Sequence, residues 1–407
     1  MSKRAVLATL IVLSLLLPVA AAGTLGPPSL LKNINPGAAN SAPLWLTKVG
    51  DTLFFAADDG TRGAELWKSD GTAAGTKLVK NINPGATPSA PATLINVGGT
   101  LFFRADDGTR GAELWKSDGT EATTKLVENI NPGAGVSFPG HFAVLEGTLF
   151  FQANDGSNGI ELWKSGGTTA TTKMVANIQP AAGSGFPSYL TRVGDTLFFQ
   201  ANDGSTGVEL WKSGGTASTT KLVKNIAPSS TSSYPEMFIN LGGTAFFAAD
   251  NGSSGVELWK SGGTGASTSI VEDIYADEED SYPDDFVAVG GILYFAADDG
   301  STGYELWRSG GTAGTTDRVK DIRDGIGSSD PSQLTNVGGT LIFQADDGPT
   351  GSELFQSGGT EGTTEQIADI NPDIDSSSPR SFTKLGTRLI FTADDGTRGD
   401  ELWKLNL

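Results

Sequence analysis

The segment TLFFRADDGTRGAELWKSDGT, residues 100–120, recurs with small changes along the whole chain. Its Glu-Leu-Trp core begins again every 48 residues, and the starting positions are Glu65, Glu113, Glu161, Glu209, Glu257, Glu305, Glu353 (as Glu-Leu-Phe) and Glu401. A fixed period of this size indicates a propeller or a stacked array of repeats. Residues 24–407 number 384 (407 minus 23), which is eight units of 48.

Each unit contains four short apolar runs bounded by Gly, Pro, Asn and Asp, which is the pattern of four β-strands. In the second unit the runs are 94–97, 101–105, 113–116 and 125–130, with a tight Gly98-Gly99 turn between the first two. The second run begins Leu101-Phe102-Phe103, so large apolar side chains point to both faces of its sheet. A propeller blade is covered on both faces by its neighbours, whereas a two-layer sandwich leaves one face wet.

The two ends of the repeat array carry complementary parts of one unit. Residues 30–34, LLKNI, match the fourth strand of the next unit, LVKNI at 78–82, whereas the chain ends at a third strand, 401–404. Pairing these ends closes a ring and leaves no free sheet edge. We therefore predict an all-β fold, a single eight-bladed β-propeller of four-stranded repeats over residues 23–407, in which the N-terminal strand completes the last blade.

Residues 1–22 have the order of segments typical of a signal peptide. Lys3 and Arg4 precede an apolar run that ends at Leu17, and small residues follow up to Ala22. The alternative, a membrane anchor, needs about 20 apolar residues, which is more than this run provides. We expect cleavage after Ala22, no transmembrane segment thereafter, and a secreted or cell-surface protein, with the periplasm as the other compartment open to it.

Composition narrows the function classes. The chain has 28 basic and 47 acidic residues, a net charge of −19, which disfavours nucleic acid and anionic lipid as partners. The absence of cysteine excludes disulfides and thiolate metal sites. His141 is the single histidine, which argues against a Ser-His-Asp triad or a multi-histidine metal site. We expect a monomeric binding or scaffold protein rather than an enzyme.

The segments ELWKSDGT at 65–72 and 113–120 resemble the signature of bacterial ELWxxDGT repeat proteins, also called hyalin-like repeat proteins. The resemblance extends over essentially all of residues 24–407. The chain departs from the motif where Phe355 replaces Trp and where glycine replaces Asp, at Gly166, Gly214, Gly262, Gly310 and Gly358. The resemblance implies an exported, surface-associated or extracellular propeller, and it implies no reaction.

The loop between the second and third strands of each unit carries a pair of oxygen-bearing side chains. Five units have two aspartates, which are Asp58, Asp59, Asp106, Asp107, Asp298, Asp299, Asp346, Asp347, Asp394 and Asp395; the others include Asn154, Asn202 and Asn251. Such pairs with loop carbonyls could bind Ca²⁺, the only cofactor that the sequence suggests. We favour the alternative, a turn in which the side chains accept backbone N–H groups, because no Asp-x-Asp-x-Asp-Gly sequence of the calcium-loop type is present.

A proline recurs in phase in the segment that joins each blade to the next, which we call the crossing. Because strands alternate in direction, the crossings and the Asp-Asp-Gly loops are expected on one face of the ring, here called the crossing face. The residue before this proline varies, and four successive units place an aromatic there: Phe138, Phe186, Tyr234 and Tyr282. Variation on a fixed scaffold commonly carries specificity. These four, with Trp45 and His141, are our candidate binding residues, although packing of the loop on the strand below explains the aromatics equally well.

Two repeated side chains are interpreted as structural. The glutamates of the Glu-Leu-Trp motif lie in buried strands, where an unpaired carboxylate costs several kcal/mol, so we expect each to be hydrogen-bonded to a neighbouring blade. The tryptophans of the motif are expected to pack between blades.

These observations favour recognition of an extracellular glycan or protein partner through the crossing face. The alternative is a carbohydrate-active enzyme, a glycosidase or lyase, working with carboxylates or with residues such as Arg104 and His141. That alternative requires two or more polar residues from one sector of the ring to converge at the mouth of the central channel.

Overall fold

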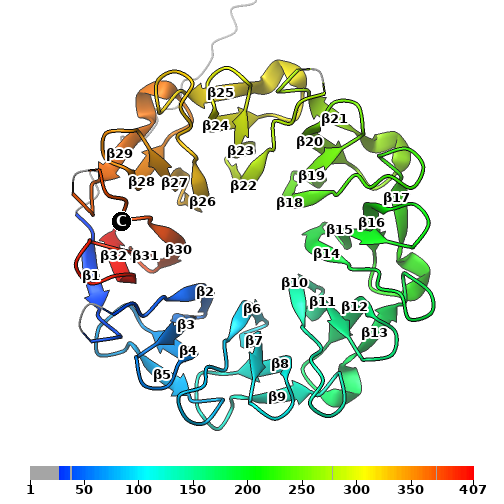
Figure 1. The fold of residues 1–407 in the computed structure, drawn as a ribbon, viewed down its shortest axis with the longest axis vertical. Helices are drawn as coiled ribbons and strands as arrows, with labels where there is room; N and C mark the ends of the chain where they lie inside the picture. Colours follow the sequence, from blue (N-terminus) through cyan, green and yellow to red (C-terminus); the bar gives the residue numbers. More distant parts are fainter. Residues whose placement is uncertain (1–26, 37–38, 277, 373) are drawn as a thin grey trace, which may run out of the picture.

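The computed structural model describes residues 27–36, 39–276, 278–372 and 374–407. Eight antiparallel sheets of four strands each stand around a common axis (Figure 1), so the predicted eight-bladed propeller is confirmed. The expected signal peptide, residues 1–22, lies outside the described residues.

Every blade has the same strand order from the axis outward. The innermost strands are β2 (Leu44–Val49), β6 (Ala92–Val97), β10 (Gly140–Leu145), β14 (Ser188–Val193), β18 (Glu236–Leu241), β22 (Asp284–Val289), β26 (Ser332–Val337) and β30 (Arg380–Leu385). The second strands are β3 (Thr52–Asp58), β7 (Thr100–Asp106), β11 (Thr148–Asn154), β15 (Thr196–Asn202), β19 (Thr244–Asp250), β23 (Ile292–Asp298), β27 (Thr340–Asp346) and β31 (Arg388–Ala393). Because each hairpin turn is short, consecutive strands pair directly.

The outer half of each blade carries the repeated motif. The third strands are β4 (Ala64–Ser69), β8 (Ala112–Ser117), β12 (Ile160–Ser165), β16 (Val208–Ser213), β20 (Val256–Ser261), β24 (Tyr304–Ser309), β28 (Ser352–Ser357) and β32 (Glu401–Asn406). The outermost strands are β5 (Lys77–Lys80), β9 (Lys125–Glu128), β13 (Lys173–Ala176), β17 (Lys221–Lys224), β21 (Thr268–Glu272), β25 (Thr316–Lys320), β29 (Glu365–Ala368) and β1 (Ser29–Lys32).

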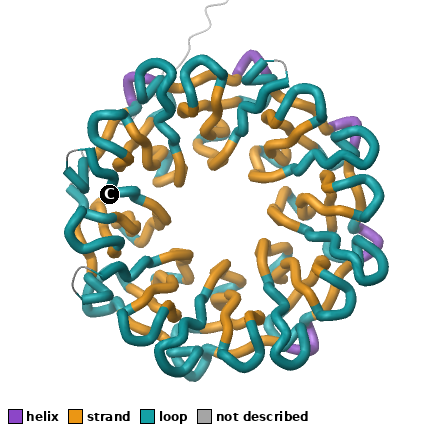
Figure 2. The backbone as a smooth tube through the Cα atoms, in the orientation of Figure 1, coloured by secondary structure: helices purple, strands orange, loops and turns teal. Residues whose placement is uncertain are grey.

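Short 3₁₀ helices follow five of the third strands and lie on the outer rim (Figure 2): η1 (Thr169–Thr171), η2 (Ala217–Thr219), η3 (Gly265–Ser267), η4 (Ala313–Thr315) and η5 (Glu361–Thr363). In the part of the chain that the structure describes, no helix has the length and apolar character needed to cross a membrane.

The ring closes through the two ends of the repeat array. Strand β1 pairs antiparallel with β32, with Ser29 opposite Lys404 and Leu30 opposite Trp403. The side chain of Leu31 is 5% exposed and joins a core cluster with residues of the first and last blades. The predicted closure by the N-terminal strand is therefore confirmed.

The hydrophobic core lies between blades rather than within them. One cluster joins Phe54 and Leu66 of the first blade to Leu101, Phe103 and Trp115 of the second, and similar clusters recur around the ring. This explains why strands such as β7 carry consecutive large apolar residues: each face is covered by a different neighbour. The motif tryptophans join these clusters, as predicted from sequence.

Candidate binding site

The crossings and the Asp-Asp-Gly loops lie on one face of the ring, as predicted. The N–H of Asp58 donates to the carbonyl of Ser41 at 2.9 Å, and Asp106 makes the same bond to Ser89 at 3.0 Å. A Cβ added to Gly63, which has a φ of +70°, would lie 2.8 Å from the backbone nitrogen of Pro88. Glycine is therefore required in the loop where the crossing packs against it.

The four aromatic residues before the crossing prolines are exposed on this face. Their side chains are 49%, 52%, 61% and 51% exposed for Phe138, Phe186, Tyr234 and Tyr282 respectively. Each has a positive φ between 42° and 47°, and the non-aromatic residues at this position, such as Ala90 and Ser378, do too. The backbone shape therefore belongs to the scaffold, while the aromatic side chain is particular to four consecutive blades.

A second variable position lies two residues after the proline, at the start of each innermost strand. The register between first and second strands shifts there in every blade, and the residue on this bulge has a φ between 52° and 61°. All eight residues differ: Trp45, Thr93, His141, Tyr189, Met237, Asp285, Gln333 and Ser381. Sequence reasoning selected only Trp45 and His141, although aligning the eight repeats on their prolines would have revealed this position.

Bulge residues from neighbouring blades are linked to one another. The N–H of Tyr189 donates to Nδ1 of His141 at 3.0 Å, and the N–H of Ser381 donates to Oε1 of Gln333 at 2.9 Å. The imidazole and phenol rings of His141 and Tyr189 lie 5.4 Å apart, centroid to centroid. The eight bulge residues, at the start of the innermost strands, form a band around the mouth of the channel, and these two pairs are in direct contact within it.

One sector of this band lines a cavity of about 600 Å³, here called the aromatic cavity. Its walls come from blades 1 to 5 and include Trp45, Arg104, His141, Tyr189 and Met237. The Trp45 side chain is 47% exposed. Trp45 also lines a second cavity of about 590 Å³ on the opposite sector, together with Asp285, Gln333 and Arg380.

Burial and charge set the protonation states in the aromatic cavity. Burial lowers the pKa of His141, and the nearby positive charge of Arg104 lowers it further. Since Nδ1 accepts the Tyr189 N–H, the neutral ring carries its proton on Nε2. The Tyr189 hydroxyl donates to Oε2 of Glu236 at 3.0 Å, and burial together with that carboxylate raises the pKa of Tyr189 to about 12.

A third cavity, of about 350 Å³, has a different character. Tyr282, Tyr304, Glu236, Asp284 and Asp330 line it. Burial, then the neighbouring charge of Asp346, raises the pKa of Asp330. The structure thus brings two of the predicted binding residues, Trp45 and His141, to the aromatic cavity and a third, Tyr282, to this acidic one.

The Asp-Asp-Gly loops are built as turns. In the first blade the N–H of Gly60 donates to Asp58, and Oδ1 of Asp59 accepts the N–H of Thr61 at 3.0 Å and of Arg62 at 3.1 Å. The same pattern recurs in six other blades, and in the seventh, where Pro349 has no N–H, Oδ1 of Asp347 accepts the N–H of Thr350. The described residues contain no group of three or more His, Cys, Asp or Glu side chains arranged to hold a metal ion. The geometry accords with the turn, and calcium binding is the alternative to be tested.

We expect Ca²⁺ and Na⁺ to shift the melting temperature equally at matched ionic strength, because the loop carboxylates already accept backbone N–H groups. The measurement is a set of melting curves in the two salts, with EDTA as reference. A calcium-specific rise would contradict the turn interpretation, since each site occupied at ten times its dissociation constant adds about 1.4 kcal/mol.

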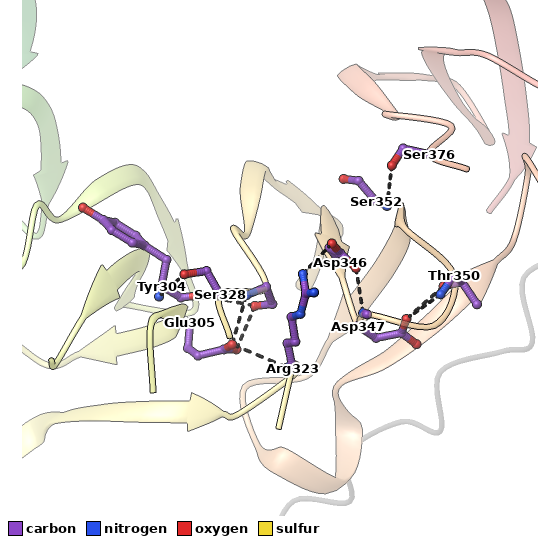
Figure 3. A network of polar contacts seen from close by, with 11 residues as sticks. Tyr304, Glu305, Arg323, Ser328, Asp346, Asp347, Thr350, Ser352 and Ser376 are labelled. Carbon is purple, nitrogen blue, oxygen red and sulfur yellow. Dashed lines mark hydrogen bonds and ion pairs between the residues drawn. The ribbon is translucent and has the colours of Figure 1, made fainter. Parts of the chain in front are cut away.

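The motif glutamates are buried and accept several hydrogen bonds, as the sequence predicts, but the donors lie in a different segment from the predicted one. Oε2 of Glu305 accepts the N–H of Ile322 at 2.7 Å and the hydroxyl of Ser329 at 2.7 Å, while Oε1 accepts the N–H of Ser329 at 3.1 Å. Figure 3 shows this glutamate beside the ion pair of Arg323 with Asp346. The partners lie in the crossing that leads to the next blade, not in the sheet of that blade, because the crossing has backbone N–H groups without a strand to bind.

The fold and the channel mouth together define an eight-bladed β-propeller repeat protein. No protein-family model and no curated protein matches the chain. A puromycin-hydrolysing peptidase of Mycobacterium tuberculosis is similar in structure, with 11% identity and a TM-score of 0.53 over 89% of this chain and 59% of that one. A structure from a study of two prolyl endopeptidases has 13% identity and a TM-score of 0.54 over 89% and 55%. This chain spans less than two thirds of either, and at these identities the likeness concerns the fold alone.

Proposed function

We propose that this protein is an exported binding propeller that recognises a glycan through its crossing face and channel mouth. The observation that carries the proposal is the run of half-exposed aromatic side chains, Phe138, Phe186, Tyr234 and Tyr282, on four consecutive blades. Aromatic faces stack on the apolar faces of sugar rings, and hydroxyl and amide groups nearby bond sugar hydroxyls. The leader-like residues 1–22 and the ELWKSDGT segments, which resemble the exported ELWxxDGT repeat proteins, support a role outside the cell.

A carbohydrate-active enzyme is the second candidate, because Arg104, His141 and Tyr189 come from neighbouring blades to one cavity. The protonation states favour binding over catalysis. Nε2 of His141 carries a proton, and burial with the neighbouring Glu236 raises the pKa of the Tyr189 phenol to about 12, so neither group is a base at neutral pH. Among the described residues that line this cavity there is no Asp or Glu to act as a glycosidase acid.

The proposal is tested by a glycan array with the wild-type chain and the variants Phe186→Ala and Tyr234→Ala. Alanine already occupies the equivalent position at Ala42 and Ala90, so these variants are expected to fold normally. We expect each to weaken binding of the selected glycan roughly three- to tenfold, the effect of losing one aromatic contact. Lys125→Ala, which changes an exposed residue of the outermost strand β9, is the control and should bind like wild type. An array without any bound glycan would refute the proposal, and cleavage of the bound glycan would favour the enzyme instead.

A further inference from the structure

We propose that the aromatic cavity binds a carboxylated sugar residue, with Arg104 as the partner of its carboxylate. This inference rests on the proposed glycan-binding function and names the ligand class for one part of the same face. It is carried by an unpaired guanidinium, by a free donor and a free acceptor in the same cavity, and by the apolar walls of the cavity.

Arg104 is exceptional among the arginines of the described residues. Each of the others forms an ion pair with an aspartate or donates to a backbone carbonyl, as in Arg62 with Asp59 and Arg388 with the carbonyl of Gly71. No hydrogen bond or ion pair of Arg104 occurs within the described part of the chain, although 47 acidic residues are present in the sequence. Burial lowers the pKa of Arg104, so the site holds a charge with reduced hydration and no counter-ion.

This arginine is a feature of one blade and not of the scaffold. Strand pairing places Arg104 opposite Ala92, which leaves room beside its long side chain. The residues at the same register in the other blades are Ala56, Gln152, Gln200, Ala248, Ala296, Gln344 and Thr392, none of which is charged. Seven blades therefore fold without a cation at this position, and its presence in the second blade needs another explanation.

A further donor and an acceptor lie beside Arg104 in the same cavity. The Nε2–H of His141 has no acceptor in the described residues, and the ring lines the same cavity. Gln152 lines it too, and its buried Oε1 has no hydrogen-bond partner. A planar guanidinium binds a carboxylate through two parallel N–H···O bonds, and a sugar hydroxyl can both donate to Gln152 and accept from His141.

The rest of the cavity suits a ring with an apolar face. Trp45, Phe142, Tyr189 and Met237 form much of the wall. With about 600 Å³ the space has the size of a small-molecule pocket and exceeds what one bound anion needs. The acidic residues Glu236 and Asp284 line the adjoining acidic cavity, which shares Met237 as a wall, so a ligand carboxylate is favoured at the Arg104 end of the aromatic cavity.

The experiment is a calorimetric titration of the full chain with glucuronate, galacturonate, mannuronate and N-acetylneuraminate, each compared with its neutral methyl ester. We expect at least one acid to bind, and its ester to bind about tenfold or more weakly. In Arg104→Gln and Arg104→Ala the affinity for the acid should fall by the same factor, while the affinity for the ester stays unchanged. Only the carboxylate binds Arg104. Both residues occur at this register in other blades, so the variants keep the fold. Gln200→Ala, at the same register outside the cavity, is the control.

The outcomes separate this inference from the proposed function. Glycans bound on an array, with affinities that do not respond to Arg104→Gln, would overturn the carboxylate site and leave glycan binding standing. If none of the four acids binds at millimolar concentration, or if benzoate binds as tightly as the sugar acids, the inference is wrong. An array that is empty while a sugar acid binds through Arg104 would instead refute recognition of an extended glycan by the exposed aromatics.

Discussion

A chain that lacks residues 23–35 is expected to melt at a markedly lower temperature than the closed ring, or to associate into oligomers. The deletion removes β1, the outermost strand of the last blade, and leaves the edge of β32 unpaired. It also removes the buried side chains of Leu31 and Ile34, each 5% exposed. Loss of a single such aliphatic side chain typically costs about 2–5 kcal/mol, so the expected effect is a large part of the stability of the domain.

The deletion has a second consequence at the other end of the chain. The N–H of Ile34 donates to Oε2 of Glu401 at 3.0 Å, so a fully buried carboxylate also loses a partner. Melting curves and size-exclusion chromatography are the measurements, and a chain that begins at Ser29 and keeps β1 is the control. A truncated chain that stays monomeric and melts like the control would contradict closure of the ring by this strand.

The second large effect is expected at Glu305, whose side chain is fully buried. Glu305→Leu removes an acceptor from four donors, which are the N–H groups of Ile322, Arg323 and Ser329 and the hydroxyl of Ser329. The two donors of Ser329 keep the carbonyl of Tyr304 as a second acceptor, so the N–H groups of Ile322 and Arg323 are the ones left orphaned. Each orphaned buried donor costs about 1–3 kcal/mol, so this variant should be strongly destabilised or fail to fold. Glu305→Gln keeps one acceptor oxygen and is expected to be the milder change.

The pH dependence provides an independent check on the same residue. Burial raises the pKa of Glu305 to about 7, above its ordinary value of 4.5. Its folded state therefore binds protons more tightly than the unfolded chain, so this contribution to stability is fully present below pH 4.5 and is lost as pH rises through 7. Relative to Glu305→Gln, the wild type should lose stability between pH 5 and pH 8.

Urea unfolding of both variants at pH 5, 6.5 and 8 measures these differences. The exposed Glu361, at the start of η5, is the matched control, and Glu361→Leu should leave the unfolding midpoint nearly unchanged. If Glu305→Leu were as stable as wild type, the hydrogen bonds from the crossing to Glu305 would not stabilise the fold. A stability difference between wild type and Glu305→Gln that does not change with pH would rule out the raised pKa of Glu305.

The local sequence was sufficient to predict the fold, because the features that determine it are short-range and repeated eight times. A 48-residue period, consecutive apolar residues such as Leu101-Phe102-Phe103, and an N-terminal strand that matches the missing strand of the last unit leave few architectures open. The burial of the motif glutamates and tryptophans followed from the same reasoning, since each side chain meets the same surroundings in every blade.

Only the tertiary structure decided which variable residues lie together. Along the chain, Trp45, Arg104, His141 and Tyr189 are each 37 to 59 residues from the next, and no local pattern relates them. Trp45, His141 and Tyr189 meet because a bulge with a positive φ sets one residue of each innermost strand at the channel mouth, and because ring closure sets blade beside blade. Arg104 reaches the same cavity from the second strand β7. The lack of a partner for Arg104 is likewise a property of the whole ring. Pairing of charges depends on distances in space, which a repeat sequence does not contain.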